Sequence, residues 1–239
     1  MKKFLGFIFV AVFAASCIGG GDDEILYRST VTFKRIDADR FYFEDCDSVA
    51  LVPYDIPVGF LKGVDEQRVM ILFHTDKVPF TTPMYGSKVT YGIDLVSADT
   101  ISTKQPVVSM GTPALDSATF GYDPVAIFAD EYFAFPSTTL EDGYLTIHFV
   151  FNYSPFFDTP HEFNLITGSD PSDPYLVRFS HNAHQDVIQY DEAQGAIAFP
   201  LKSLPDTKQD TVALKLVWDN PEYMVQDTLT FKYCSRTDW

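Results

Sequence analysis

Residues 144–153 read YLTIHFVFNY, and this stretch decides the fold class of the chain. Apolar residues alternate with others over much of the run from Leu145 to Phe151. Successive side chains of a β-strand point to opposite faces, so this alternation is typical of a strand with one buried face. The run LKLVW at residues 214–218 repeats the pattern. The C-terminal half is therefore predicted to be built from β-sheets.

Further strands are predicted on both sides of this stretch. They cover residues 125–129, 132–135, 162–167, 175–181, 196–200, 212–218 and 227–233. Turn-forming residues separate these short apolar runs, as is typical of strands. Seven or eight strands of this kind over 123–239 predict a two-sheet β-sandwich.

The N-terminal half contains five short apolar runs, at residues 30–36, 40–43, 49–52, 68–74 and 88–96. They suit a small β-barrel, and the OB fold is one such barrel. Residues 105–122 hold Pro106, Gly111, Pro113 and Gly121 and few long apolar runs, which predicts a linker. No stretch of twelve or more residues carries an uninterrupted helical stripe. We therefore expect an all-β protein with a small OB-like barrel followed by a β-sandwich.

The N-terminus has the layout of an export signal. Lys2 and Lys3 precede an apolar run at residues 4–15, and small residues lead into Cys17. A helix of this length rises about 18 Å and cannot cross a hydrocarbon core of about 30 Å, so the run is a signal rather than an anchor. Small residues directly before Cys17 resemble the lipobox of bacterial lipoproteins. This predicts lipidation at Cys17, with an ordinary secretory signal as the alternative.

Residues 17–27 are expected to form a lipidated tether. Its glycines provide flexibility, and three acids follow them, Asp22, Asp23 and Glu24. Acids shortly after the lipidated cysteine resemble the signal that sends lipoproteins to the cell surface in Bacteroidetes-type bacteria; a solvated spacer is the alternative. The membrane is thus an expected partner, through a lipid anchor in the bacterial outer membrane, with the chain either periplasmic or exposed at the cell surface.

The expected organisation has five parts. They are a signal peptide at 1–16, the tether at 17–27, the OB-like barrel at 28–105, the linker at 106–122 and the β-sandwich at 123–239. Hydrophobic residues make up 46% of the chain, which predicts compact domains rather than disorder.

The charge balance excludes one class of partner. The chain carries 17 Lys and Arg against 33 Asp and Glu, a net charge of −16. Nucleic acids are bound mainly through clustered cations, so no nucleic-acid partner is expected. Residues 106–239 hold 6 Lys and Arg against 19 Asp and Glu. This negative field favours cations or basic partners, although solubility alone also explains it.

Two cysteines remain after Cys17 is set aside. Cys46 and Cys234 lie in different predicted domains, and exported proteins can form disulfides. A bridge would join the two domains, and two unpaired thiols are the alternative. Neither cysteine has the neighbouring His and acid of a nucleophile.

Several segments together resemble one known family. They are the lipobox, the segment DEQRVMI at 65–71, the segment DPV at 123–125 leading into 144–153, and the segment RFSHNA at 178–183 followed by Asp186. These are similar to the NigD-like lipoproteins of Bacteroidetes. The resemblance implies an N-terminal OB-like domain and a C-terminal β-sandwich domain, and it implies no catalytic residues. The family's name comes from an operon linked to a bacteriocin, which implies an immunity or accessory role.

The best metal-like cluster is the segment from His181 to Asp186, with His184 inside it and His148 as a further imidazole. Zinc needs three or four N, S or O ligands in a tetrahedral array. The cluster falls where a strand gives way to a turn, so hydrogen bonds to turn backbone explain it more simply. His184 stands where the resemblance implies an aromatic residue. No metal and no cofactor is expected.

Other sequence motifs of calcium-binding or catalytic sites are weak or absent. Two pairs of loop acids, Asp37 with Asp39 and Asp170 with Asp173, lack the glycine and distal glutamate of an EF-hand loop. The chain contains no Gly-x-Ser-x-Gly, Walker, Gly-x-Gly-x-x-Gly or His-Glu-x-x-His motif. The protein is therefore expected not to be an enzyme, with an uncharacterised hydrolase as an alternative.

Aromatic residues gather where a polar loop would be expected. Tyr153, Phe156 and Phe157 lie between two predicted strands, in the run YSPFF. Exposed rings at such a position can stack on sugars or anchor a protein partner. The alternative is that the loop folds back and buries the rings in the core. We expect a non-catalytic binding or accessory module with an unknown protein or glycan partner; a bacteriocin-associated immunity protein is an alternative.

Overall fold

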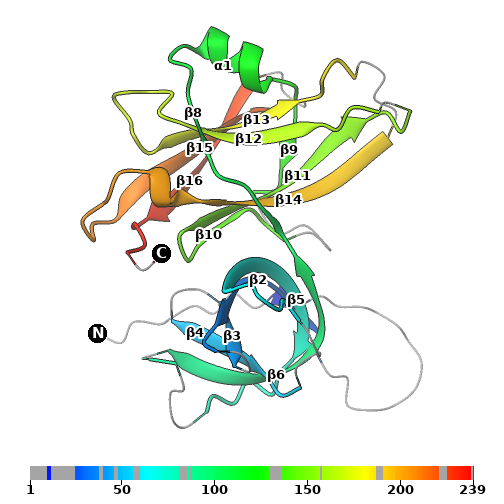
Figure 1. Cartoon of the computed structure of the whole chain (residues 1–239), viewed down its shortest axis with the longest axis vertical. Coiled ribbons are helices and arrows are strands. Elements are labelled where there is room, and N and C mark those ends of the chain that lie inside the picture. Colours follow the sequence, from blue (N-terminus) through cyan, green and yellow to red (C-terminus); the bar gives the residue numbers. More distant parts are fainter. Residues whose placement is uncertain are drawn as a thin grey trace. The chain divides into compact units, whose positions relative to one another are not determined.

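Figure 1 shows the computed structural model of the chain. It describes residues 10–11, 25–37, 40–45, 48–55, 60–80, 85–86, 88–129, 136–156, 158–186, 191–220, 225–237 and 239. The chain divides into two compact units, Met1–Ile101 and Ser102–Trp239.

The first unit is a closed barrel of five strands. They are β2 (Tyr27–Arg35), β3 (Phe41–Asp45), β4 (Val49–Pro53), β5 (Glu66–His74) and β6 (Val89–Thr100). The strand order is β2-β3-β4-β6-β5, and β2 pairs again with β5 to close the barrel. The pairing of β4 with β6 is parallel, and the other pairings of the barrel are antiparallel. A short strand, β1 (Val10–Ala11), pairs with the start of β2.

Alternate positions of the barrel strands build its core. Val31 and Phe33 of β2, like Val69, Ile71 and Phe73 of β5, are completely buried. The side chains of a strand alternate between its faces, so one apolar face per strand suffices to fill a small barrel. The barrel predicted for the N-terminal half is thereby confirmed.

The second unit consists of two sheets. The first has the order β10-β11-β14-β7, with β9 also paired to β11, and the second has the order β16-β15-β13-β12-β8. Strands of the first sheet are β7 (Ser102–Thr103), β9 (Ala126–Ile127), β10 (Thr139–Glu141), β11 (Tyr144–Tyr153) and β14 (Asp191–Pro200). Strands of the second are β8 (Val107–Val108), β12 (Glu162–Thr167), β13 (Leu176–Asn182), β15 (Val212–Asn220) and β16 (Val225–Tyr233). A 3-10 turn, η1 (Leu201–Ser203), follows β14.

Aromatic rings from both sheets meet in the core of the second unit. Phe149 of β11 lies 4.4 Å from Phe163 of β12 and 5.3 Å from Phe179 of β13, measured between ring centroids. Aliphatic residues such as Leu145, Leu165 and Leu216 surround these rings. Two sheets that pack through their apolar faces form a sandwich, so the predicted β-sandwich is confirmed as well.

The expected linker at 106–122 belongs to the second unit instead. Strand β8 pairs in parallel with β12, and helix α1 (Pro113–Phe120) contacts β12 and β13. Thr112 caps the helix by accepting a hydrogen bond from the backbone N–H of Leu115, and the helix ends at Gly121. Proline and glycine therefore mark the ends of a short helix here, and do not mark a domain boundary.

Predicted and observed strands agree where the runs are long. The bounds of β11 and β12 match the predicted runs, whereas β14 begins at Asp191, five residues before its predicted start at 196. Strands β7, β8 and β10 are two or three residues long and were not predicted, since so short a run has no readable alternation. The strand predicted at 132–135 lies outside the described residues.

No helix among the described residues is both long enough and apolar enough to span a membrane.

Candidate functional site: an aromatic pocket beside a buried histidine and aspartate network

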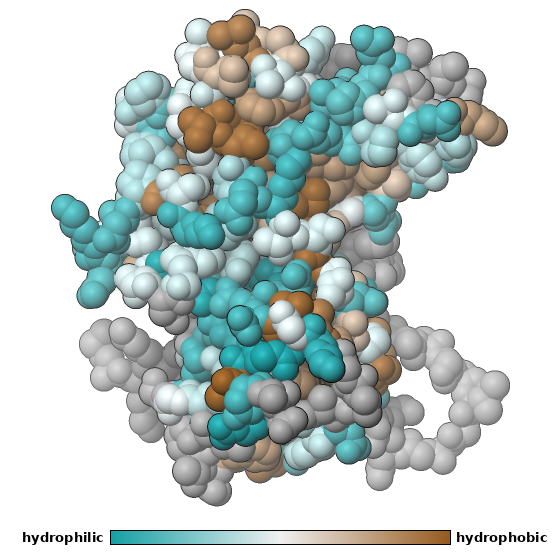
Figure 2. All heavy atoms as spheres, viewed as in Figure 1, coloured by the Kyte–Doolittle hydropathy of each residue, from teal (hydrophilic) through white to brown (hydrophobic). Residues whose placement is uncertain are grey.

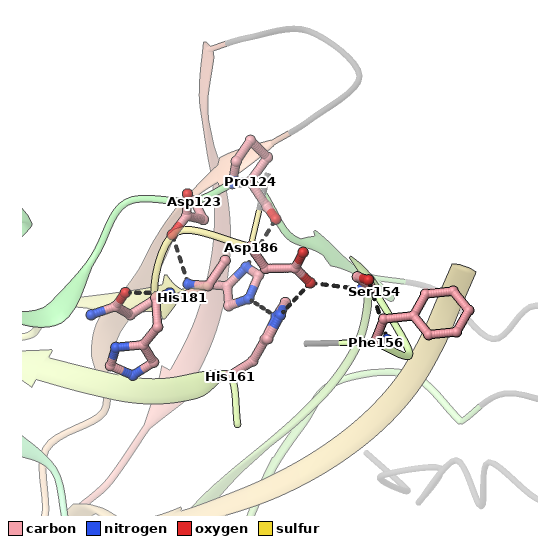
Figure 3. Close-up of polar contacts among 10 residues, drawn as sticks. Asp123, Pro124, Ser154, Phe156, His161, His181 and Asp186 are labelled. Atoms are coloured by element: carbon pink, nitrogen blue, oxygen red, sulfur yellow. Dashed lines mark hydrogen bonds and ion pairs between the residues drawn. The ribbon is translucent and has the colours of Figure 1, made fainter. Parts of the chain in front are cut away.

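The connection from β11 to β12 carries the most exposed large apolar side chain among the described residues. Phe156 has 87% of its surface accessible, whereas Ser154, two residues earlier, is 7% accessible. The connection turns at residues 155–156, and the Ser154 hydroxyl accepts a hydrogen bond from the backbone N–H of Phe156 at 3.3 Å. In Figure 3 the Phe156 ring points away from the buried polar groups and toward solvent. The alternative that this loop buries its rings is thus wrong for Phe156.

A pocket of about 190 Å³ lies next to this connection. Its walls come from the end of β11, the connection and the start of β12. The residues that line it are Phe151, Tyr153, Ser154, Thr159, Pro160, His161 and Phe163. Most of these side chains are aromatic or apolar, as in typical small-molecule and side-chain binding pockets. We call it the aromatic pocket.

His161 and Ser154 of the aromatic pocket also belong to a buried polar network, which Figure 3 shows. His181 Nδ1 is 3.1 Å from the carbonyl oxygen of Pro124, and His181 Nε2 is 2.9 Å from His161 Nδ1. His161 Nε2 is 3.2 Å from Asp186 Oδ2, and the same oxygen accepts a hydrogen bond from the backbone N–H of Ser154 at 2.6 Å. Three segments distant in sequence, around Pro124, at 154–161 and at 181–186, are therefore joined in one chain of contacts.

The contacts determine where the protons lie. A carbonyl only accepts, so His181 Nδ1 donates to Pro124. Burial lowers the pKa of His181, and the neighbouring His161 ring lowers it further, although the Pro124 carbonyl and Asp123 act in the opposite direction. A neutral His181 accepts at Nε2, so His161 Nδ1 donates to it.

Aromatic stacking holds the two imidazoles in place. The His181 ring is stacked on Phe163, with centroids 4.7 Å apart and planes 9° apart. Phe151 packs against both imidazoles, at 5.1 Å from His161 and 5.5 Å from His181. Phe151 and Phe163 also line the aromatic pocket, so the same rings form the pocket wall and support the network.

The stability of the second unit is expected to fall as the pH drops below about 6.5, the ordinary histidine pKa. Below that pH the unfolded chain binds a proton at residue 181, whereas folded His181, with its lowered pKa, stays neutral. Protons then favour the unfolded state. Urea unfolding between about pH 5 and 7.5 measures this loss, and NMR titration of the His181 ring measures its pKa.

Replacement of His181 by asparagine is expected to remove most of this dependence, because the amide can still donate to Pro124 but does not titrate. His184 provides the matched control, since its side chain is 35% accessible and its Nε2 lies 3.8 Å from Glu162. The variant His184→Gln should keep the pH dependence of the parent chain. If the stability of His181→Asn depended on pH as strongly as that of the parent chain, the assignment of this dependence to His181 would be contradicted.

The sequence identified part of this network and missed its centre. His181 and Asp186 do come together, but His184 and His148 do not join them. His184 lies near Glu162, and His148 occupies a buried position of β11. His161 was missed. Only the pairing of β12 with β13 could have identified it. That pairing sets Phe163 opposite His181, and residue 161 lies two positions before Phe163, on the same side of the strand.

Three predicted site residues lie outside the described part of the chain, namely Cys17, Cys46 and Phe157. Tyr153 is partly exposed and lines the aromatic pocket. Cys234 is a free, exposed thiol, and its sulfur accepts from the Thr207 hydroxyl at 3.8 Å. Because Cys46 lies outside the described residues, a bridge between Cys46 and Cys234 stays a prediction. Within the described residues, no group of three or more His, Cys, Asp or Glu side chains could hold a metal ion.

A comparison with known protein families identifies the family of this chain. The profile of the NigD-like C-terminal beta sandwich domain matches residues 106–233, which is more than half of the chain. The chain belongs to the NigD-like family. Two segments that carry the resemblance in sequence, at 123–125 and 178–186, supply Pro124, His181 and Asp186 to the buried network.

Solved structures are similar over nearly the whole NigD-like chain. A protein named as toxin-related from Parabacteroides distasonis is 27% identical, with a TM-score of 0.67, and the match covers 88% of this chain and 94% of that one. A NigD-like immunity protein from Bacteroides caccae is 17% identical, with a TM-score of 0.56, covering 87% and 96%. A protein named as a lipoprotein from Bacteroides fragilis is 11% identical, with a TM-score of 0.56, covering 89% and 100%. No curated protein matches the chain.

Proposed function

We propose that this NigD-like protein is a non-catalytic binding module of the bacterial cell envelope, held to the membrane by a lipid on Cys17. The observation that supports it best is the exposed Phe156 ring beside the aromatic pocket. A large ring left in water contributes nothing to folding, whereas at an interface it can supply much of the binding energy. A protein or glycan partner that covers this ring would explain its exposure.

The buried network supports a structural role over catalysis. Both nitrogens of His161 and both nitrogens of His181 are engaged by other members of the network. Ser154 reaches Asp186 through its backbone N–H, and its hydroxyl accepts from Phe156. The contacts of the described residues therefore include no hydroxyl nucleophile paired with either imidazole, as nucleophilic catalysis requires.

Replacement of Phe156 by alanine is expected to weaken partner capture at least about tenfold and to leave stability within about 0.5 kcal/mol of the parent. The measurement is crosslinking and affinity capture from intact cells, with the captured partner identified and quantified. Tyr122→Ala is the matched control, because Tyr122 is 66% exposed elsewhere on the same unit. Undiminished capture by Phe156→Ala would contradict the proposal.

Replacement of Cys17 by alanine is expected to release the protein from the membrane fraction, since two or more acyl chains hold a protein stably to a bilayer. Cell fractionation and labelling with a fatty-acid analogue measure this change. Cys234→Ala, which removes an exposed thiol remote in sequence, is the matched control and should stay membrane-bound and labelled. Surface protease treatment of intact cells then distinguishes the cell surface from the periplasmic face. Full membrane retention of Cys17→Ala would exclude the lipid as the sole tether.

A second candidate is an immunity or accessory role toward a bacteriocin. Two similar structures favour it by their names, one as a NigD-like immunity protein and one as toxin-related. The expected result is that deletion of the gene sensitises the producing cell to its own bacteriocin. Unchanged sensitivity would exclude this role and leave the binding module in place.

A further inference from the structure

We propose that the aromatic pocket receives one aromatic side chain of a protein partner, flanked in that partner by lysine or arginine. This inference rests on the proposed binding function and specifies the chemistry of the partner. The size of the pocket, the ring-lined walls and the acids at its rim carry the argument.

The size of the pocket matches a single ring. Its volume is about 190 Å³. A cavity of about 150 Å³ lined by apolar side chains is known to accept benzene in another protein, so this pocket has room for a phenyl or indole group. The rings of Phe151, Tyr153 and Phe163 supply the walls. Ring pairs in tilted or edge arrangements add to the energy of apolar burial.

The neighbouring strand leaves these rings accessible. Strand β14 pairs with β11 so that Ala193 lies opposite Phe151, and Asp191 lies opposite Tyr153. Directly opposite residues project from the same face of a sheet. A methyl group at residue 193 covers little of the Phe151 ring, and both Phe151 and Tyr153 are only partly buried. The small side chain of Ala193 on β14 therefore leaves the neighbouring aromatic rings of β11 uncovered.

Two acids adjoin residues that line the pocket, because Asp158 precedes Thr159 in sequence and Asp191 lies opposite Tyr153; we call the positions of these two acids the rim. Asp191 is exposed next to Tyr153, and Asp158 is exposed on the connection that carries Phe156. Neither carboxylate forms an ion pair with a described residue. The second unit as a whole is strongly acidic, with 6 Lys and Arg against 19 Asp and Glu over 106–239. A cation next to the inserted ring would therefore be attracted, and an acidic peptide would be repelled.

The polar groups of the pocket favour a ring without hydroxyls over a sugar. Recognition of a sugar needs several convergent donors and acceptors. The imidazole of His161 is engaged with His181 and Asp186, and the oxygen of Ser154 already accepts from Phe156. The O–H of Ser154 and the hydroxyls of Tyr153 and Thr159 remain, which is a small polar set for a sugar ring.

The test uses the mature chain from residue 17 with Cys17→Ala, so that the protein is free of lipid. The probe is the peptide acetyl-Lys-Trp-Lys-amide, titrated while amide and ring NMR signals are recorded. Acetyl-Glu-Trp-Glu-amide is the charge-reversed comparison, and methyl β-glucoside is the sugar comparison. The basic peptide is expected to bind at least about tenfold more tightly than the acidic one, with shifts at Tyr153, His161 and Phe163, and to weaken as salt is raised.

Variants of the two rim acids and of Tyr153 distinguish the contribution of charge to peptide affinity from that of the pocket wall. Asp158→Asn and Asp191→Asn should each weaken the basic peptide about threefold, as expected for an exposed ion pair. Asp210→Asn is the matched control, because Asp210 is exposed in another loop of the same unit and should leave affinity unchanged. Tyr153→Ala should weaken both peptides at least about tenfold, since it removes a wall of the pocket.

The outcomes distinguish this inference from the function on which it rests. Equal binding of both peptides, tighter binding of the sugar, or shifts outside the pocket would overturn the inference, as would absence of peptide binding at millimolar concentration. The proposed binding function would survive these results if Phe156→Ala still lost its partner in intact cells. If Phe156→Ala kept its partner, the binding function itself would fail.

Discussion

Replacement of Asp186 by alanine is expected to lower the free energy of unfolding of the second unit by about 3 to 5 kcal/mol, because two buried groups lose the carboxylate oxygen that they contact and each such loss costs about 1 to 3 kcal/mol. Asp186 is 4% exposed, and its Oδ2 atom meets both His161 Nε2 and the backbone N–H of Ser154. Alanine leaves the imidazole and the N–H group buried without an acceptor. Each unsatisfied group adds its own desolvation penalty.

Urea unfolding followed by tryptophan fluorescence measures this change. The chain has two tryptophans, Trp218 and Trp239, and both lie in the second unit, so the signal reports that unit alone. Asp158→Ala is the matched control, since Asp158 is an exposed acid on the connection that contains Ser154. It should change stability by no more than about 0.5 kcal/mol. A loss below about 1 kcal/mol for Asp186→Ala would show that the network is not a stabilising unit.

Asparagine at residue 186 tests the charge separately. One oxygen of Asp186 serves both contacts, at 3.2 Å from His161 and 2.6 Å from Ser154. An amide can place either its oxygen or its nitrogen at that point. The amide oxygen keeps the Ser154 bond but offers His161 a weaker acceptor than a carboxylate, whereas the amide nitrogen would face the N–H donor of Ser154. We therefore expect Asp186→Asn to lose about 2 to 3 kcal/mol, less than alanine.

Replacement of Gly121 by alanine is expected to cost about 2 to 4 kcal/mol, through backbone strain and overpacking together. Gly121 ends α1 with φ of +83°, a conformation that side chains rarely adopt. A Cβ atom there would lie 2.4 Å from the carbonyl oxygen of His181 and 2.5 Å from the Cα atom of Asn182. Both contacts are with the backbone of β13, which cannot rotate away as a side chain can.

The variant Gly168→Ala distinguishes the cost of backbone strain from the cost of steric contact. It has φ of +71°, but a Cβ atom there would meet nothing within 4 Å. Gly168→Ala should therefore cost only about 1 kcal/mol, the strain of a left-handed alanine. Hydrogen exchange over α1 provides a second measurement, since Gly121→Ala should expose the amides of residues 115–120 by displacing the helix from β13. Equal losses for the two variants would show that the contact with β13 is unimportant.

Strand positions were predictable because their signal is local. The alternation in 144–153 depends only on which residues face the core, and β11 has those bounds in the structure. Helix α1 was missed although its end signals were present at Thr112, Pro113 and Gly121. Eight residues are too few to display an amphipathic stripe, and isolated helices of that length are unstable in water. Packing on β12 and β13 supplies the stability that the segment itself lacks.

The candidate site was predictable only in part. Tyr153 and Phe156 drew attention because aromatic residues are unusual in a connection, and His181 and Asp186 because they stand close together in the sequence. His161 was missed, since strand periodicity indicates which face a residue occupies but not which residue of another strand lies beside it. The pairing of β12 with β13 brings His161 to His181, 20 residues away.

Composition, alternation and the N-terminal segment by themselves determined that this chain has two sheet-built domains, a strong negative charge and the pattern of an exported lipoprotein. These properties depend on residues that are neighbours along the chain, or on totals such as the composition and the net charge. Only the tertiary structure decided that the ring of Phe156 is exposed, that Asp186 contacts His161, and that residues 106–122 belong to the sandwich. Burial and hydrogen bonding depend on which distant segments meet, because solvent is excluded from the contacts between them and not from any one segment alone.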